Sequence, residues 1–141
     1  MFELASATFD LVGEEEKETL TGKSDSVCEG YKPRQTWQID KGVSDQIEHY
    51  NIHRSVYHRQ HPAILQPHLH EIEAFARHNH THVFFTILRL LAIGLDLPEE
   101  TLIEKHLFEA PGESSVRFMN YPRTIEEELK TKNVWLKGHT G

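Results

Sequence analysis

The chain has 141 residues and a formal net charge of -7 at pH 7, with 15 Lys and Arg residues against 22 Asp and Glu residues. This length allows one domain at most. The acidic balance, without a cluster of Lys and Arg residues, argues against nucleic acid or an anionic membrane as a partner. One cysteine, Cys28, excludes an internal disulfide framework. The sequence shows no leader pattern and no apolar run long enough to span a bilayer, so we expect a soluble, cytoplasmic protein.

The first third of the chain predicts a helix, a loop and two short strands. Apolar residues recur at helical spacing over residues 2–12, which predicts a helix at the amino terminus. Residues 21–29 are small, polar and turn-prone, so we expect a loop there. Short strands are predicted within residues 36–39 and 47–52.

A long helix after Pro62 is the strongest prediction in the chain. Its apolar residues recur at intervals of three and four, which predicts one buried stripe along the helix, and Gly94 is expected to stop it. A second helix is predicted to run through Leu107, with Asp96 as its cap and Pro98 in its first turn. The predicted stripe consists of Leu65, Leu69, Ile72, Ala76, Val83, Ile87, Leu90 and Leu91.

The pattern changes to strands near the carboxyl end. Residues Ser115–Tyr121 predict a strand that Pro122 ends, and Glu126–Glu128 predict a charged turn or short helix. A final apolar strand is predicted at Val134–Leu136. This strand has no partner left in the sequence, and isolated two-stranded pieces are marginal in water. We therefore expect a sheet of which part is missing.

The eleven histidines raise the question of a metal site. His78 and His82 are four residues apart on the long helix, so both imidazoles could face one ion. A structural site needs about four ligands, however, and the nearest acids lie two turns away. We therefore favour solvated or hydrogen-bonded rings for this pair. The remaining scattered histidines are expected mostly at the surface: His49, His53, His58, His61, His68, His70 and His106.

Several stretches resemble one enzyme family. The string NVWLKGHT, Asn133–Thr140, resembles the approach to the first iron ligand in the isopenicillin N synthase-like family of non-haem iron(II), 2-oxoglutarate-dependent dioxygenases. Gly112–Arg123 resembles the family's strand that ends in Tyr-Pro, and Phe75–Leu102 is similar to the long helix that backs its barrel. Phe9–Glu18 resembles a turn of the family, with Val-Gly in place of Leu-Pro. The resemblance covers nearly the whole chain.

The resemblance implies an α+β fold, namely the helical amino-terminal half of a double-stranded β-helix, or jelly-roll, oxygenase. It divides the chain into an amino-terminal helical region over about residues 1–110 and the first barrel strands over about residues 112–141. The catalytic barrel would then be largely missing. On this view the 141 residues are less than half of a larger domain.

The resemblance also implies a site, which this sequence only partly retains. The family holds Fe(II) with a 2-His-1-carboxylate triad and leaves positions for 2-oxoglutarate and O₂. His139 matches the first iron ligand, and Tyr121 lies near a tyrosine that contacts the cosubstrate. Gly141 stands at the position of the Asp ligand and has no side chain to bind iron. The distal His and the cosubstrate-binding Arg have no counterpart, so the binding of Fe(II) and 2-oxoglutarate by this chain is doubtful.

Two functions of different classes follow as expectations. The first is an oxidoreductase of this dioxygenase family, acting on a small molecule in specialised metabolism and inactive as the chain stands. The second is a non-catalytic interaction module that pairs with a full-length relative through its long helix. A weaker third possibility is a histidine-rich metal binder centred on His78 and His82.

Overall fold

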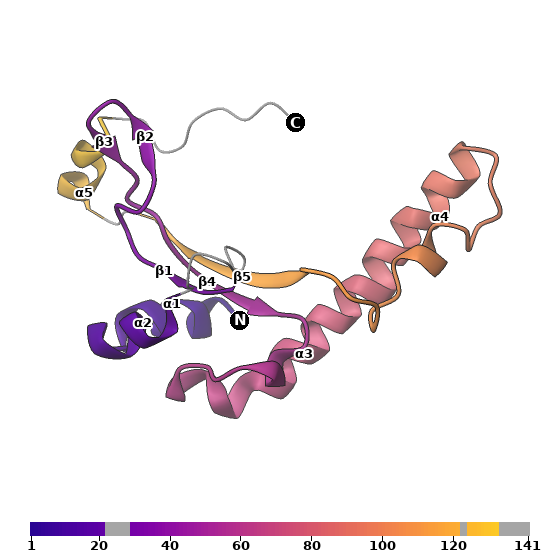
Figure 1. The fold of residues 1–141 in the computed structure, drawn as a ribbon, viewed down its shortest axis with the longest axis horizontal. Helices are drawn as coiled ribbons and strands as arrows, with labels where there is room; N and C mark the ends of the chain where they lie inside the picture. Colours follow the sequence, from indigo (N-terminus) through magenta and orange to yellow (C-terminus); the bar gives the residue numbers. More distant parts are fainter. Residues whose placement is uncertain (22–28, 122–123, 133–141) are drawn as a thin grey trace.

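The structure is a computed structural model that describes residues 1–21, 29–121 and 124–132. It combines helices with sheet, which confirms the α+β class (Figure 1). The described strands form one three-stranded sheet and one two-stranded hairpin, so the jelly roll stays a prediction. The predicted strand at 134–136 lies outside the described residues. The helices are α1 Phe2–Asp10, α2 Glu14–Leu20, α3 Leu69–His78, α4 Phe85–Gly94 and α5 Ile125–Lys130, and the strands are β1 Gly30–Lys32, β2 Gln38–Asp40, β3 Val43–Ser44, β4 Glu48–His53 and β5 Ser115–Asn120.

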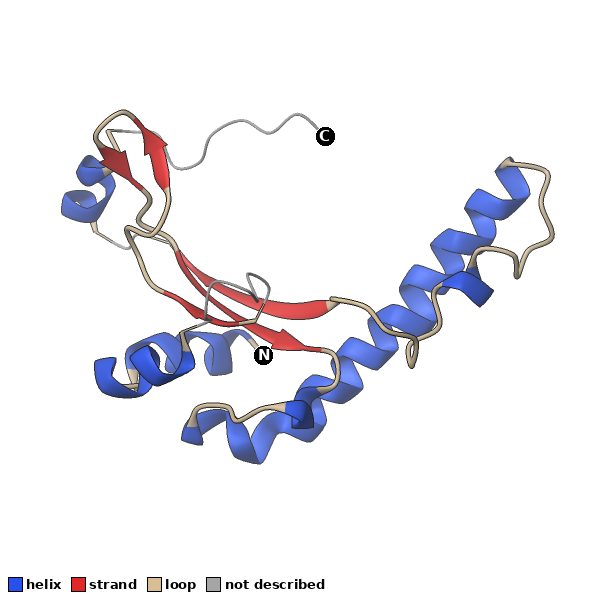
Figure 2. Ribbon diagram, viewed as in Figure 1, coloured by secondary structure: helices blue, strands red, loops and turns tan. Residues whose placement is uncertain are grey.

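The larger sheet has the order β1-β4-β5, and both of its strand pairs are antiparallel (Figure 2). Strands β4 and β5 confirm the predictions at 47–52 and 115–121. Strand β2 confirms the weaker prediction at 36–39 and pairs with β3. Strand β1 and its pairing with β4 were not predicted, because three residues are too few to show a period. The predicted helical region up to residue 110 therefore also contains the strands β1 to β4.

The core lies between one face of this sheet and the helices. Tyr31, Tyr50 and Phe118 are directly opposite one another on the three strands, so their side chains form one row on the same face. Phe9 of α1 and Ile72 of α3 pack against this face, and all five side chains are buried. Burial of these apolar side chains provides the main favourable free energy of the fold.

The predicted long helix is confirmed, although it is not a regular α-helix throughout. It begins with the 3₁₀ segment η2, Ala63–His68, continues through α3, and passes through the π-helical segment η3, Asn79–Phe84, into α4. The π segment inserts a wider turn between the two α-helices and re-aims the side chains that follow it. Helix α4 ends at Gly94, as predicted.

The prediction of a continuous buried stripe along this helix is wrong for its second half. Leu65, Leu69 and Ile72 are buried, whereas Leu90 is 65% exposed. The reason is visible in Figure 1, where α4 extends away from the sheet. The following segment folds back on α4 at the 3₁₀ turn η4, Ile103–Lys105. The large apolar side chains that remain exposed over α4, its end and the preceding segment η3 are Val83, Ile87, Leu90, Leu91, Ile93, Leu95 and Leu97.

The predicted second helix through Leu107 is also wrong, apart from the single turn η4. Asp96 has a φ of +55° and therefore does not have the extended conformation of an amino-terminal cap. It instead closes α4, because its N–H donates to Ile93 O and the N–H of Leu97 donates to Ala92 O. These two bonds are the Schellman arrangement that ends a helix. The acidic turn after it then has no apolar face long enough to continue as a helix.

Two shorter predictions can also be compared with the structure. The charged stretch at 126–128 lies in α5, which confirms the predicted turn or short helix. The loop expected at 21–29 lies mostly outside the part of the chain that the structure describes. Among the described helices, none is both long enough and apolar enough to cross a membrane.

Candidate functional site

The family resemblance assigned two residues to a site, His139 and Tyr121, and the structure describes only Tyr121. His139, with Gly141, lies outside the described residues. Tyr121 follows the last residue of β5 and is 44% exposed. Its side chain is therefore at the end of a paired edge strand rather than in the core. Whether Tyr121 and His139 share a site stays a prediction.

His78 and His82 lie one turn apart, across the junction of α3 and η3. Their rings stack with centroids 4.5 Å apart and an angle of 16° between the planes, and both residues are exposed. His82 Nδ1 also forms a hydrogen bond with the Thr81 hydroxyl at 2.9 Å. Among the described residues they belong to no group of three ligating side chains. The prediction of solvated or hydrogen-bonded rings is confirmed.

Two histidines that we expected at the surface are buried. His61 is 5% exposed; its Nε2–H donates to Val56 O and its Nδ1 accepts the Tyr50 hydroxyl, each at 2.8 Å. Burial lowers the pKa of His61. The sequence missed it because Tyr50, its hydrogen-bonding partner, is brought to it only by the packing of β4 against the following loop.

His49 is the second buried histidine, and it lies on the sheet face opposite the core. It is 3% exposed, its ring lies 5.5 Å from that of Trp37, and its Nδ1 has no hydrogen-bonding partner among the described residues. Burial, and then the positive charges of Arg117 and Lys32, lower its pKa from the ordinary 6.5 to about 4, against an opposing effect of Asp45. His49 is therefore neutral at physiological pH.

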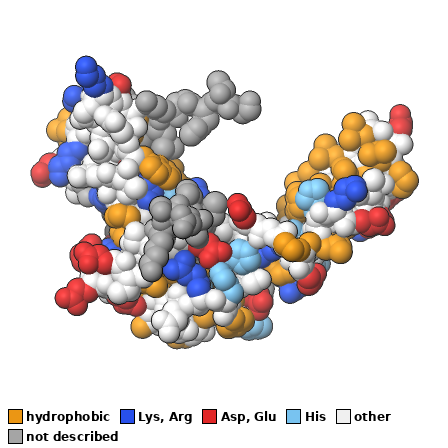
Figure 3. Space-filling model, in the orientation of Figure 1, with side chains coloured by type: hydrophobic (Ala, Val, Ile, Leu, Met, Phe, Trp, Pro, Cys, Tyr) orange, Lys and Arg blue, Asp and Glu red, His pale blue; other side chains and the backbone are white. Residues whose placement is uncertain are grey.

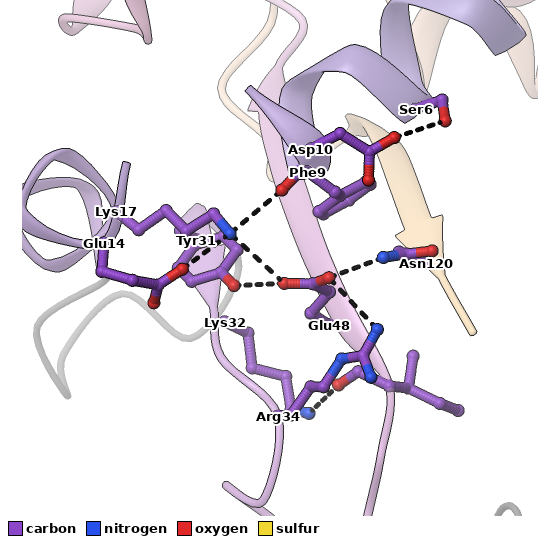
Figure 4. Close-up of polar contacts among 11 residues, drawn as sticks. Ser6, Phe9, Asp10, Glu14, Lys17, Tyr31, Lys32, Arg34, Glu48 and Asn120 are labelled. Carbon is purple, nitrogen blue, oxygen red and sulfur yellow. Dashed lines mark hydrogen bonds and ion pairs between the residues drawn. The ribbon is translucent and has the colours of Figure 1, made fainter. Parts of the chain in front are cut away.

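A buried polar network surrounds Glu48 at the start of β4 (Figure 4). The Tyr31 hydroxyl donates to one carboxylate oxygen, and Asn120 Nδ2 donates to the other at 2.6 Å. Lys17 Nζ lies 3.9 Å and Arg34 Nη2 lies 3.5 Å from the same carboxylate. Burial and the Glu48 carboxylate raise the pKa of Tyr31, so its proton stays in place.

Lys17 connects this network to the amino-terminal helices. Its ammonium donates to Phe9 O at 3.1 Å and to the Glu14 carboxylate at 3.0 Å. Only 9% of its side chain is exposed, whereas 83% of the Glu14 side chain is. Both oxygens of the Glu48 carboxylate already have partners within the chain, so the network stabilises the fold and does not present an open reactive group.

A second polar group combines one carboxylate and two imidazoles. Glu29, His53 and His58 each place one ligating atom within 4.8 Å of the others. His58 Nε2 lies 2.8 Å from Glu29 Oε2, and the rings of His53 and His58 meet edge to face with centroids 4.8 Å apart. Sequence spacing did not indicate this group, because Glu29 reaches it through the pairing of β1 with β4.

A pocket of about 440 Å³ lies between η3 and the start of β5. Its walls combine aromatic rings with the side chains of Arg54 and Arg117, whose guanidinium groups donate to Ala110 O and to Asn51 Oδ1. Arg54, which is 6% exposed, donates to Ala110 O, and its guanidinium lies 5.5 Å from the Phe108 ring. The lining includes Arg54, Phe75, His80, Phe84, Phe108 and Arg117.

Comparisons with protein-family models, with curated proteins and with solved structures find no match to this chain.

Proposed function

We propose that this chain is a scaffold of the Fe(II)/2-oxoglutarate-dependent dioxygenase family, an oxidoreductase class acting on small molecules in specialised metabolism, and that it is inactive as it stands. The observation that carries the proposal is that two of the resembling stretches meet at one sheet. Lys17, from the stretch Phe9–Glu18, and Asn120, from the stretch Gly112–Arg123, both contact Glu48. Helix α3, in which the stretch Phe75–Leu102 begins, packs against the same sheet through Ile72, which precedes that stretch.

The chain's own donor set does not fit the family's iron. The triad needs two imidazoles and a carboxylate at one ion. His139 supplies one imidazole, and Gly141 supplies no side chain where the family has its Asp. We therefore assign the chain a scaffolding role, in which it packs against a catalytic barrel. We assign it no step of the reaction. Release of succinate from 2-oxoglutarate is accordingly not expected from this chain alone.

Substitution of Gly141→Asp tests this assignment. The family resemblance implies a strand here, and on a strand residues two apart point to the same side, so the introduced carboxylate and His139 would share one ion. We expect the affinity for Co²⁺, used as a spectroscopic substitute for Fe(II), to rise at least about tenfold when this ligand is added. The titration is followed by visible absorbance, in a background of His53→Ala and His58→Ala that removes the other ligating group.

The matched control for this experiment is the same chain with His139→Ala added, which should return the affinity to its starting value. An affinity that does not change on Gly141→Asp contradicts the family assignment. A gain that survives His139→Ala contradicts it as well, because the new carboxylate would then act without the histidine that the resemblance identifies.

The exposed apolar side chains over α4 favour a second candidate, a non-catalytic module that pairs with a full-length member of the same family. Figure 3 shows hydrophobic side chains gathered at that end of the molecule. Leu90 and Leu91 are 65% and 52% exposed, and apolar patches of this kind mark interaction sites. The long helix is also the element that the resemblance places against a barrel.

A binding experiment tests the pairing. We expect the chain to co-elute with a purified full-length family oxygenase in size-exclusion chromatography, and Leu90→Glu to abolish the complex because the new charge would be buried. Lys41→Glu, which changes an exposed charge in the β2–β3 turn, should leave it intact. A chain that elutes alone and monomeric contradicts this second candidate.

A further inference from the structure

We propose that Glu29, His53 and His58 form a binding site for a divalent transition-metal ion such as Zn²⁺. This proposal does not involve His139 and does not rest on the proposed function. Two imidazoles and one carboxylate are a ligand set that such ions accept, and the three ligating atoms already lie within 4.8 Å of one another. Closure around an ion therefore needs side-chain movement of the order of 1 Å, and no refolding.

The tautomer of His58 suits a ligand. Its Nδ1–H donates to Ser55 O at 2.8 Å, so Nε2 is the nitrogen that would bind an ion after giving up the proton it shares with Glu29. This Nε2 lies 2.8 Å from the Glu29 carboxylate. A hydrogen bond from the second ring nitrogen to a backbone carbonyl is what orients a metal-binding histidine in proteins. An ion between Nε2 and the carboxylate would replace the proton that they share now.

His53 is oriented in a similar way. Its Nε2–H donates to Gly112 O at 2.9 Å, so its lone pair is on Nδ1. That nitrogen accepts the N–H of Ser55 at 3.0 Å, a bond that an ion would displace. The backbone N–H released by the ion can turn to water, because Ser55 is exposed. The free energy lost when this hydrogen bond breaks is therefore small compared with the free energy gained from coordination of the ion by Nδ1.

The residues around Glu29, His53 and His58 determine the affinity of the site for an ion and its access to water. Arg59 Nη1 lies 3.9 Å from the Glu29 carboxylate, and its positive charge opposes a cation. His58 is exposed and the other two residues are partly exposed. Three protein ligands with access to water form an open site, in which water completes the coordination. We expect moderate affinity and a site that links β1, the end of β4 and the segment at Gly112.

Titration of the metal-free chain with Zn²⁺, followed by calorimetry at pH 7.5, tests the site. We expect binding of one ion per chain and a higher melting temperature at saturating Zn²⁺. His58→Ala and Glu29→Gln should each weaken binding at least about tenfold. Binding should also weaken as the pH is lowered, because protons compete with the ion for the ligating nitrogens.

Two controls separate this site from the other histidines. The double substitution of His78→Ala and His82→Ala removes the exposed stacked pair and should change Zn²⁺ affinity less than about twofold. His139→Ala should likewise leave it unchanged. Circular dichroism establishes that each variant is folded, and Glu29→Gln, which keeps the shape of the side chain, serves if an alanine variant is not. Absence of Zn²⁺ binding, or binding that depends on His78, His82 or His139, overturns the proposal.

Discussion

Substitution of Glu48→Gln should lower the free energy of unfolding by about 3–5 kcal/mol, the loss that follows removal of one partner from a buried ion pair. The buried ammonium of Lys17 and the partly buried guanidinium of Arg34 would lose the carboxylate that they face. The Tyr31 hydroxyl would keep an acceptor, but a neutral one. Urea unfolding followed by circular dichroism measures the change.

Glu14→Gln is the matched control for this prediction. Glu14 also pairs with Lys17, at 3.0 Å, but 83% of its side chain is exposed to water. Exposed pairs contribute little, so we expect a loss within about 1 kcal/mol. If Glu48→Gln costs no more than Glu14→Gln, the network does not stabilise the fold as we describe it.

The stability of the chain should fall as the pH is lowered from 6.5 toward 4, because His49 is buried and neutral. Its pKa of about 4 in the folded chain lies below the ordinary 6.5, so the unfolded chain binds the proton more readily in this range. The contribution of His49 is therefore fully present above pH 6.5. Below pH 6.5 the free energy of unfolding decreases by up to about 1.4 kcal/mol per pH unit because of His49. His61, whose pKa is also lowered by burial, acts in the same direction.

The measurement is the free energy of unfolding in urea at a series of pH values between 6.5 and 5, where most carboxyl groups stay ionised. His49→Gln, which replaces the imidazole by a neutral amide, should make this slope clearly shallower. The remaining slope belongs in part to His61. A slope that is equally steep with and without His49 contradicts the prediction.

Local sequence predicted the elements that have a clear local pattern of apolar residues. The long helix and its end at Gly94 followed from apolar spacing, since an α-helical turn bonds residues four apart. The strands β4 and β5 followed from their alternation and composition. At Asp96 the same reasoning failed, because the residue can cap either end of a helix. The backbone bonds of Leu97 decided for the end of α4.

The candidate metal group and the buried network could not be predicted in this way. Glu48 and Asn120 are 72 residues apart, and only the pairing of β4 with β5 brings them together. Glu29 meets His58 through the pairing of β1 with β4. The spacing of residues along the chain does not indicate which strands pair, so the sequence did not show that His53 and His58 lie close to Glu29.

The amino-acid sequence was enough to indicate the α+β class and the positions of the long helix and of strands β4 and β5. Which polar groups are buried depends on the tertiary structure. Lys17, Glu48 and His49 are of residue types that usually lie at the surface. They are buried here because sheet pairing and helix packing enclose them. The physical reason is that periodicity encodes which face of an element is apolar. The protonation and partners of a charged side chain depend on what distant segments place around it.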